Sequence, residues 1–352
     1  MDVFCKRLAF ISFIFFFSSS CSNRGNLFMS GIPVSRRVSA DTEITLHPYD
    51  TITSNALVAA SSIVAKVDSF LVFATSSEEY SFIVYNEKTD CVELEFPKKG
   101  RGPNEQVFSK ISQIRRSNGS VEVDILGLNE HSILTIDLYR SIENKQMEVV
   151  RRTELPPNTM YAHFYGNSIA CIVLFDEYDY TLQILNATSL ERENILLPFG
   201  LDVYDPGFIT CTWRMKEDGT KCLWAMQWAN KFNILDLENL DNSASFSTSR
   251  RILPDRVLFD RISDKSPAAV TSYYTTAQVT DDDIFLLYRG VSGEDVNKTK
   301  PLEIQNFSWE GIYRNRFLIH DAIDTFIVTE GSDEIYGFSW DESRVYKYSL
   351  SL

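Results

Sequence analysis

The sequence predicts an all-β fold: a six-bladed β-propeller of four-stranded antiparallel blades. Three observations lead to this prediction. The chain has almost no helical periodicity, but it has many short alternating runs rich in Val, Ile, Phe, Tyr and Thr, separated by polar turns. A strand that ends in Asn, Asp or Ser recurs six times, with end residues 51, 49, 50, 72 and 41 positions apart. A tight turn that leads into an apolar strand precedes each of these strands, so the two features keep step through six units.

The recurring elements can be placed in order along the chain. The recurring strands are Phe82–Asn86, Leu134–Asp137, Gln183–Asn186, Asn233–Asp236, Gln305–Ser308 and Tyr346–Ser349. The turns that precede them contain Asp68, Asn118-Gly119, Gly166-Asn167, Asp218-Gly219, Asp281-Asp282-Asp283 and Gly331-Ser332-Asp333.

Each unit accommodates four strands. In the first unit we expect strands near Ile63–Val67, Phe70–Thr75, Ser81–Asn86 and Cys91–Phe96, with the second unit beginning near Lys110. Four short strands in every 40 to 50 residues, roughly, are typical of a propeller blade. A β-sandwich is the structural alternative, but it does not require a constant period. The single wide spacing predicts an insertion near Asp241–Ala269.

The C-terminal unit predicts how the ring closes. The sixth unit ends at Leu352, directly after its third strand, so its outermost strand is missing. A propeller closes its ring with a strand from the other terminus, because an open edge would leave backbone groups unpaired. We expect an N-terminal strand near Asp41–Leu46, which alternates suitably, to complete the sixth blade.

The N-terminus has the layout of a secretory signal. Lys6 and Arg7 precede the apolar run Leu8–Phe17, and small residues then lead to Cys21. Ten apolar residues are too few to span a bilayer, which takes about 20. We expect residues 1–20 to be a lipoprotein signal peptide, residues 21–40 the lipidated Cys21 and a linker, and residues 41–352 the propeller domain. Cleavage near Ser20 without lipid is the alternative.

Composition and residue spacing exclude several classes of function. A formal charge of −14 and a pI of about 4.8 argue against nucleic-acid binding, which needs clustered Lys and Arg. The four cysteines of the body have no metal-ligand spacing. We expect them to be free thiols that are buried as small hydrophobic residues, although the sequence does not decide whether any of them form a disulfide. They are Cys91, Cys171, Cys211 and Cys222. The four histidines are scattered, so we expect no metal site and no cofactor.

Three segments carry a family resemblance. They are the loop Lys98–Glu105 (KKGRGPNE), Phe307–Gly311 (FSWEG) and Ile335–Ser339 (IYGFS). With the lipoprotein start and six units, the chain resembles the TolB-like six-bladed propeller lipoproteins of Bacteroidetes, although Gln106 stands where that family has an aromatic residue. The resemblance implies a cell-envelope location and no established reaction. In that phylum, export to the cell surface is associated with acidic residues soon after the lipidated Cys. Ser22–Gly25 has none, so the resemblance implies the periplasmic side of the outer membrane over the cell surface.

Candidate binding residues lie on what we call the loop face. It is formed by the loops that join the second strand of each blade to its third and each blade to the next. Aromatic rings, Arg and amides gathered on a rigid scaffold suit a sugar, a peptide or a protein surface. The candidates are Arg101, Asn104, Glu105, His131, Tyr178, Tyr204, Trp228, Arg251, Arg289 and Trp340.

Two other motifs have plain structural readings. Gly100 and Gly102 supply backbone freedom where the chain crosses between blades, although the loop could also cradle an anion. Asp281-Asp282-Asp283 could bind calcium, but it lies in a turn on the opposite face, and a solvated turn is the default. The first strands of the blades offer the channel few carboxylates.

The function that these observations predict is a membrane-tethered binding or scaffold propeller of the cell envelope without catalysis. Its partner would be a protein, peptide or glycan, the lipid would be its only membrane contact, and we expect a monomer. The alternative is an envelope hydrolase or lyase that acts on carbohydrate or lactone substrates. A third reading is a subunit that serves assembly alone. Carboxylates or His converging at the channel mouth would favour the enzyme.

Overall fold

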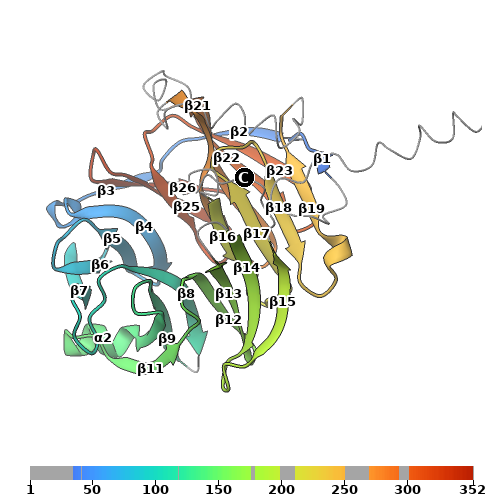
Figure 1. Ribbon diagram of the computed structural model, residues 1–352. Helices are drawn as coiled ribbons and strands as arrows, with labels where there is room; N and C mark the ends of the chain where they lie inside the picture. The colour runs from blue at the N-terminus through green and yellow to red at the C-terminus, as the bar shows by residue number, and fades with distance from the viewer. Residues whose placement is uncertain are drawn as a thin grey trace, which may run out of the picture.

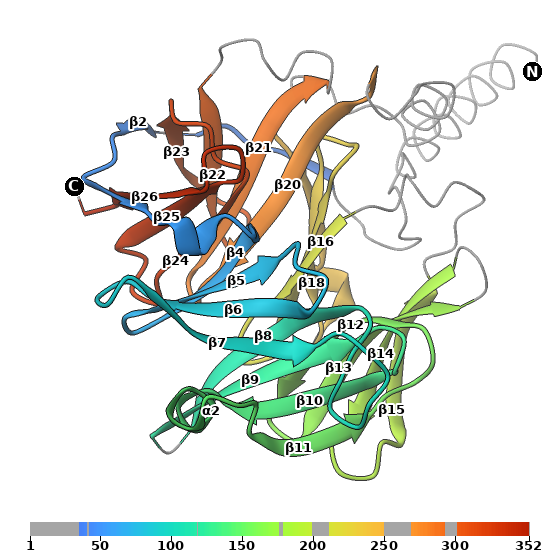
Figure 2. The same ribbon diagram turned by 90° about the vertical axis from the view of Figure 1, so that its left-hand side faces the viewer.

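Six antiparallel sheets follow one another around a central axis in the computed structural model (Figures 1 and 2). The structure describes residues 35–40, 42–117, 119–175, 179–198, 211–249, 269–292 and 301–351. Each sheet is one blade, numbered in chain order, and the first strand of each blade lies nearest the axis. The prediction of an all-β six-bladed propeller with four-stranded antiparallel blades is confirmed.

The strands of the first three blades are consecutive in the chain. Blade 1 holds β4 (Ala60–Val67), β5 (Phe70–Thr75), β6 (Tyr80–Asn86) and β7 (Cys91–Lys98). Blade 2 holds β8 (Ser109–Ser117), β9 (Ser120–Gly127), β10 (Ser132–Asp137) and β11 (Val149–Glu154). Blade 3 holds β12 (Thr159–Tyr165), β13 (Ser168–Phe175), β14 (Asp179–Asn186) and β15 (Arg192–Pro198).

The other three blades each take a strand from the N-terminal segment. Blade 4 holds β16 (Cys211–Met215), β17 (Lys221–Met226), β18 (Phe232–Asp236), β19 (Ala244–Ser247) and then β1 (Ser35–Arg37). Blade 5 holds β20 (Thr271–Val279), β21 (Asp283–Ser292), β22 (Leu302–Ser308), β23 (Tyr313–Ile319) and then β2 (Thr42–Leu46). Blade 6 holds β24 (Thr325–Val328), β25 (Glu334–Ser339), β26 (Arg344–Ser349) and β3 (Asp50–Thr53).

The ring is closed by an N-terminal strand, as expected, but not by the expected one. The segment near Asp41–Leu46 was predicted to complete blade 6, and β2 in fact pairs in parallel with β23 as a fifth strand of blade 5. Blade 6 is completed by β3, which pairs antiparallel with β26. The strand β1 pairs in parallel with β19, so the N-terminal segment contacts three successive blades.

The insertion expected between blades 4 and 5 overlaps an ordinary strand of blade 4. We expected an insertion near Asp241–Ala269, but Ala244–Ser247 within it forms β19, the ordinary fourth strand of blade 4. Residues 250–268 lie outside the described part of the chain.

Short helical elements interrupt three connections in the described part of the chain. The helix α2 (Leu138–Asn144) follows β10, and Asp137 caps its start by accepting a hydrogen bond from the Arg140 backbone N–H at 3.0 Å. Two 3₁₀ turns, η1 (Asn55–Leu57) and η3 (Leu240–Asn242), lie before β4 and after β18. No helix within the described ranges is long and apolar enough to cross a bilayer.

The core lies between neighbouring blades, where both faces of each sheet are covered. Trp224 of blade 4 is almost fully buried and stacks on Trp213 with ring centroids 4.5 Å apart. On the other face of that sheet, Phe232 packs against Phe307 of blade 5, with ring centroids 4.6 Å apart and the rings tilted by 52°. Rings of this size bury the most apolar surface per residue, so the high aromatic content serves packing between blades.

Candidate functional site

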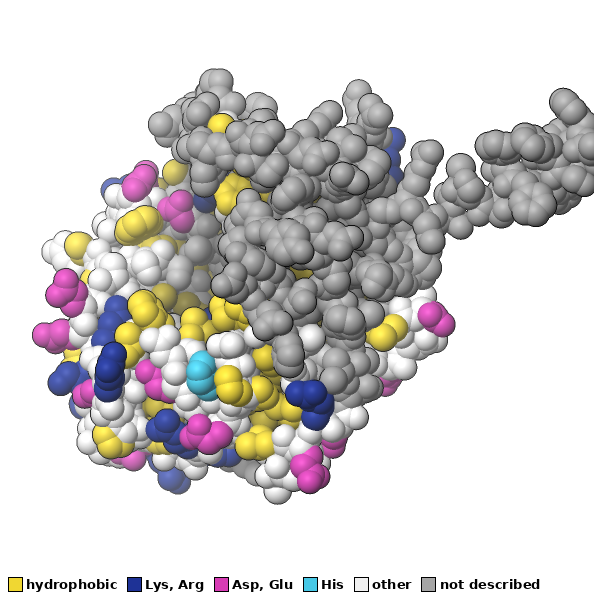
Figure 3. Space-filling model, viewed as in Figure 1, with side chains coloured by type: hydrophobic (Ala, Val, Ile, Leu, Met, Phe, Trp, Pro, Cys, Tyr) yellow, Lys and Arg dark blue, Asp and Glu magenta, His cyan; other side chains and the backbone are white. Residues whose placement is uncertain are grey.

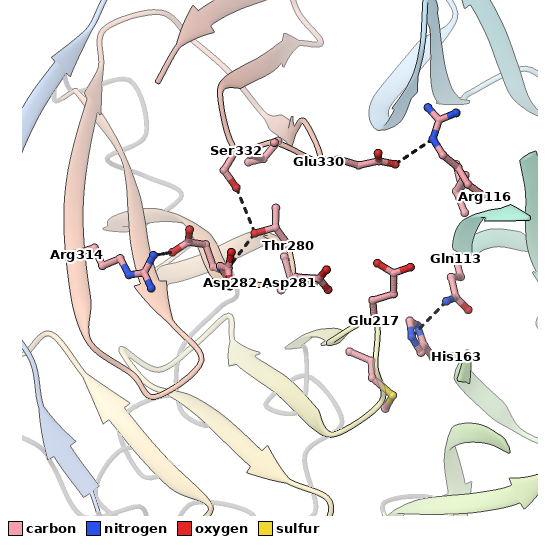
Figure 4. A pocket seen from close by; sticks show the side chains of 16 residues that line it. Gln113, Arg116, His163, Glu217, Thr280, Asp281, Asp282, Arg314, Glu330 and Ser332 are labelled. Atoms are coloured by element: carbon pink, nitrogen blue, oxygen red, sulfur yellow. Dashed lines mark hydrogen bonds and ion pairs between the residues drawn. The ribbon is translucent and has the colours of Figure 1, made fainter. Parts of the chain in front are cut away.

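A cavity of about 830 Å³ opens at one end of the central channel (Figure 4). We call it the channel mouth and its side of the molecule the turn face, because the turns between the first and second strands of the blades surround it. Blades 2 to 6 contribute its lining. The lining residues are Gln113, Ile114, Arg116, His163, Met215, Glu217, Val279–Asp283, Arg314, Val328 and Glu330–Ser332.

Strand ends and turns contribute different chemistry to the channel mouth. The last residues of the first strands place apolar side chains there, among them Met215, Val279 and Val328. The turns that follow carry the acids, because tight turns favour Asp, Ser and Gly. The Thr280 backbone N–H donates to the Asp283 carbonyl at 2.9 Å, which closes one of these turns.

Several charged groups at the channel mouth are already compensated. Arg314 pairs with Asp283 at 2.8 Å. Arg116 pairs with Asp68 at 3.0 Å and with Glu330 at 3.4 Å. These two guanidinium groups are therefore engaged by the protein's own carboxylates.

Three other carboxylates lack a direct partner among the described residues, but the charges of two of them, Asp281 and Asp282, act on Lys216, which is paired with Asp218. Glu217, Asp281 and Asp282 are exposed to solvent, and none forms an ion pair or a side-chain hydrogen bond in the described part of the chain. Figure 4 shows Glu217 and Asp281 extending toward one another. Partial burial raises the pKa of Glu217, and the negative charges of Asp281, Glu330 and Asp218 raise it further.

His163 lines the same cavity from β12 and is only 6% exposed. Burial and the positive charge of Arg115 lower the pKa of His163 to about 4, so the ring is neutral at physiological pH. Gln113 holds the ring, with its Nε2 atom 3.4 Å from His163 Nε2. The channel mouth therefore combines an acidic rim with a neutral, fixed imidazole.

The geometry limits what the channel mouth can do chemically. Among the described residues, no group of three or more His, Cys, Asp or Glu side chains is arranged to hold a metal ion. The carboxylates attract cations, although Lys216 already offsets part of the charge of Asp281 and Asp282. A carboxyl with a raised pKa near an ionised one is also the minimum for general acid–base chemistry.

The first strands of the blades were expected to offer the channel few carboxylates, and none of the residues with which they line the channel mouth is an Asp or Glu. Ile114 and His163 line the channel mouth from the first strands of blades 2 and 3. Ile111 and Trp213 line a separate cavity of about 360 Å³ formed by the opposite halves of the first strands. The carboxylates come from the turns instead. The sequence does show acidic residues in the recurring turns of blades 4, 5 and 6. Which of these acids form an ion pair depends on side-chain geometry, which the sequence does not show.

The loop between blades 1 and 2 holds three of the sequence-predicted residues. Arg101 and Asn104 are exposed, and Glu105 is half-buried. Glu105 Oε2 accepts a hydrogen bond from the Gly102 backbone N–H at 2.8 Å. The Glu105 carboxylate therefore holds the loop together. His131 lies in the turn between the second and third strands of blade 2, and its Nδ1 accepts a hydrogen bond from the Asn158 backbone N–H at 3.3 Å.

The reason for the two glycines of this loop differs from the one expected. Neither Gly100 nor Gly102 has a positive φ, so neither is needed for a left-handed backbone. A Cβ at Gly100 would overlap the Glu105 carboxylate, and one at Gly102 would lie 2.9 Å from Glu105 Cδ. The two glycines leave room for the Glu105 side chain, which packs directly against them.

Other sequence-predicted residues are spread over blades 4, 5 and 6. Asp324 joins two of them: Arg289 Nη2 donates to its Oδ1 at 3.4 Å, and the Trp340 backbone N–H donates to its Oδ2 at 2.9 Å. The Trp340 side chain is 56% exposed, and Trp228 is half-buried in the loop after β17. The remaining predicted residues lie outside the described chain. They are Cys21, Tyr178, Tyr204 and Arg251.

The described cysteines behave as small core residues or surface thiols. Cys222 pairs in register with Met215, and Cys211 pairs with Met226, as the Asp218-Gly219 turn requires. Cys171 is buried, whereas Cys91 is exposed.

One face of the molecule shows no single acidic patch among its described residues. On the face in Figure 3, Lys and Arg side chains are interspersed with Asp and Glu side chains around the edge.

Known structures share the fold. A DUF4221 family member from Bacteroides vulgatus is 10% identical, with a TM-score of 0.52, and the match covers 86% of this chain and 97% of that one. A protein from Bacteroides fragilis is 12% identical, with a TM-score of 0.52 and coverage of 86% and 87%. Chaetomium thermophilum Raptor is 12% identical over 87% of this chain and 29% of its own, with a TM-score of 0.51. No protein-family model and no curated protein sequence matches the chain.

Proposed function

We propose that this protein is a non-enzymatic binding or scaffold propeller that receives a partner protein or peptide at its channel mouth. The observation that carries the proposal is the set of unpaired carboxylates, Glu217, Asp281 and Asp282, around an open cavity of about 830 Å³. Cavities of this size take ligands or partner segments, and the rigid blades fix the positions of the groups that line it. Neutral glycans offer these carboxylates no counter-charge, so a protein or peptide is favoured over a glycan.

The location that we propose is the bacterial cell envelope. A positively charged start, a short apolar run and small residues before Cys21 support a lipoprotein signal with lipidation of that cysteine. On this proposal the protein is a TolB-like lipoprotein of the outer membrane, on the periplasmic side, and the lipid is its only membrane contact. Fatty-acid labelling that is lost in Cys21→Ala would support the anchor, and labelling that persists would contradict it.

In-cell photocrosslinking tests the binding proposal. A photoreactive residue at position 330, on the turn face, is compared with one at position 340, on the loop face; both native side chains are largely exposed. We expect a specific protein adduct from position 330. An adduct only from position 340 would move the site to the loop face, and adducts from neither position would contradict a binding role.

A second candidate function is a hydrolase or lyase for carbohydrate or lactone substrates. The observation that favours it is the raised pKa of Glu217 next to the Asp281 carboxylate, which is how an acid and a base are kept in different protonation states. Turnover of aryl glycosides or lactones by the wild type, lost in both Glu217→Gln and Asp281→Asn, would favour the enzyme. Lack of turnover across both substrate classes would favour the binding propeller.

A further inference from the structure

The cavity of about 360 Å³ in the loop-face half of the central channel differs in charge from the channel mouth, and we call it the inner cavity. All six blades contribute to its lining. No Asp or Glu is among the described residues that line it, although the chain carries a formal charge of −14. Its charged residues are Arg214 of β16, which is partly buried, and Lys110 of β8, which is exposed.

Arg214 has no carboxylate partner in the described part of the chain. Its Nη1 donates to the Trp213 backbone carbonyl at 2.8 Å, and its side chain makes no other hydrogen bond or ion pair with the described residues. The group whose charge acts on it is Tyr161, a phenol that is neutral at physiological pH. Burial lowers the pKa of Arg214, but a guanidinium group stays protonated in proteins. The Nε and Nη2 groups of Arg214 therefore carry positive charge with no anion beside them.

Arg115 shows what this edge of a guanidinium group binds when a carboxylate is near. Arg115 Nε and Nη2 donate to the two carboxylate oxygens of the buried Asp124, at 2.9 and 3.0 Å. Charges that are withdrawn from water are normally paired in this way. The other described Arg residues without a carboxylate partner are all exposed, so water solvates them: Arg36, Arg37, Arg101, Arg151 and Arg192.

Two hydroxyl groups of the inner cavity also lack a partner. Ser109 Oγ and Thr275 Oγ1 are shielded from solvent and form no hydrogen bond in the described chain. Their residues line the cavity from blades 2 and 5, and Arg214 lines it from blade 4. Buried polar groups nearly always have a partner, so three sets of unsatisfied donors around one cavity indicate an acceptor from outside the chain.

The size and walls of the inner cavity restrict what that acceptor can be. A volume of about 360 Å³ lies at the lower end of the range for small-molecule sites. Ile63, Phe82 and Trp213 are buried residues that line it, so the ligand has an apolar part. A carboxylate matches the single charge and the planar fork of Arg214. A phosphate dianion needs a second cation, and Lys110 is exposed to solvent.

We propose that the inner cavity binds a small organic carboxylate through the Nε and Nη2 groups of Arg214. Ser109 and Thr275 supply hydroxyl donors to the ligand, and its apolar body packs against the aromatic and aliphatic walls. The inner cavity and the channel mouth lie at opposite ends of the channel. This is a second binding site, and it does not depend on the proposed function.

A ligand-observed NMR titration of the purified protein with 3-phenylpropionate tests the inference, with uncharged 3-phenylpropionamide as the matched ligand. The acid should bind saturably and about tenfold more tightly than the amide, because only the acid forms a charge-assisted pair. Arg214→Met keeps the alkyl stem and should weaken binding of the acid about tenfold while changing that of the amide less than about twofold. Arg192→Met removes the same charge from an exposed position and should change neither affinity.

Thr275→Val tests the hydroxyl separately from the charge, because valine has nearly the same shape. It should weaken binding of the acid about threefold to fivefold, as loss of one hydrogen bond does. Thermal melts without ligand establish that each variant is folded.

Three outcomes would overturn the inference. The first is equal affinity for the acid and the amide, or an affinity for the acid that Arg214→Met leaves unchanged. The second is displacement of the acid by an equal concentration of inorganic phosphate, which would mean general attraction of anions. The third is no saturable binding of 3-phenylpropionate or benzoate at millimolar concentration, which would mean that water alone fills the inner cavity. Crosslinking from position 330 tests the channel mouth, so failure of the proposed function is read from a different experiment.

Discussion

The seam where the ring closes is held by a network of charges around Lys347. Lys347 Nζ lies 2.9 Å from Asp50 of the closing strand β3 and 3.0 Å from Glu87 of blade 1. Glu87 also pairs with Lys66 at 2.8 Å, and both ammonium groups lie over the Tyr336 ring, at 5.1 and 5.7 Å from its centroid. The Lys347 and Glu87 side chains are only 13% and 15% exposed. We predict that Lys347→Met loosens the seam.

The size of the effect follows from what each contact contributes. The half-exposed pair with Asp50 is worth at most about 1 kcal/mol. The buried pair with Glu87 costs more to break, but Glu87 keeps Lys66, so about 1–2 kcal/mol remains. Methionine retains the packing of the alkyl stem. The total of about 2–3 kcal/mol corresponds to a fall in Tm of about 4–6 °C for a chain of this size.

Thermal unfolding followed by circular dichroism measures this shift, with Lys88→Met as the matched control. Lys88 is exposed in the neighbouring turn and has no ion pair in the described chain, so its replacement should leave Tm unchanged within about 1 °C. Equal melting temperatures for the two variants would refute the idea that the network holds the seam.

The pH dependence gives a second check on the same network. Burial opposes ionisation of Glu87, but Lys66 and Lys347 outweigh it and hold the pKa of Glu87 below its ordinary value. The stabilisation is therefore complete above the ordinary pKa of Glu and is lost as the pH falls through the lowered one. The deficit of Lys347→Met should shrink near pH 3, and a deficit that stays constant with pH would refute the electrostatic explanation.

Three further predictions concern other parts of the molecule. Glu217→Gln should raise stability at pH 7 by about 0.5 kcal/mol or less, because the raised pKa of Glu217 means that ionisation opposes folding; the gain should vanish near pH 3 in denaturant titrations. Gly100→Ala should cost about 1 kcal/mol by displacing Glu105, and a double-mutant cycle with Glu105→Ala should show that this cost disappears without the carboxylate. Iodoacetamide should modify Cys91 in the native protein but leave Cys171 unmodified until unfolding, since burial raises the pKa of Cys171 to about 12, and peptide mapping by mass spectrometry checks both.

The architecture was predictable because it repeats. Six matching strands and six matching turns place every blade, and the predicted strands of blade 1 agree with β4 to β7 within a few residues at each end. The closing strand was not predictable in the same way. Thr42–Leu46 and Asp50–Thr53 are both short, extended segments, and the sequence does not reveal that the outer edges of blades 4 and 5 also accept a strand.

The candidate site was predictable only in part, for a different reason. The loop face was chosen because propellers commonly bind there, and the acids of the turns were taken as solvated. Asp283 and Asp218 do have partners, Arg314 and Lys216, whereas Glu217 and Asp281 do not. Adjacent positions in the same kind of turn thus differ in compensation, which depends on side-chain directions that a sequence pattern does not contain.

The N-terminal strands impose an order on folding. Thr51 pairs with Tyr346, 295 positions later, so β1, β2 and β3 are synthesised first but find their neighbours only after most of the chain exists. Contacts this distant in sequence form slowly, because the chain between them must be ordered before the pairing stabilises anything. Until then, three short strands and the edges of three blades present unpaired backbone groups. Until its last blade has been made, a nascent chain of this protein therefore carries strand edges that are open to pairing with other chains.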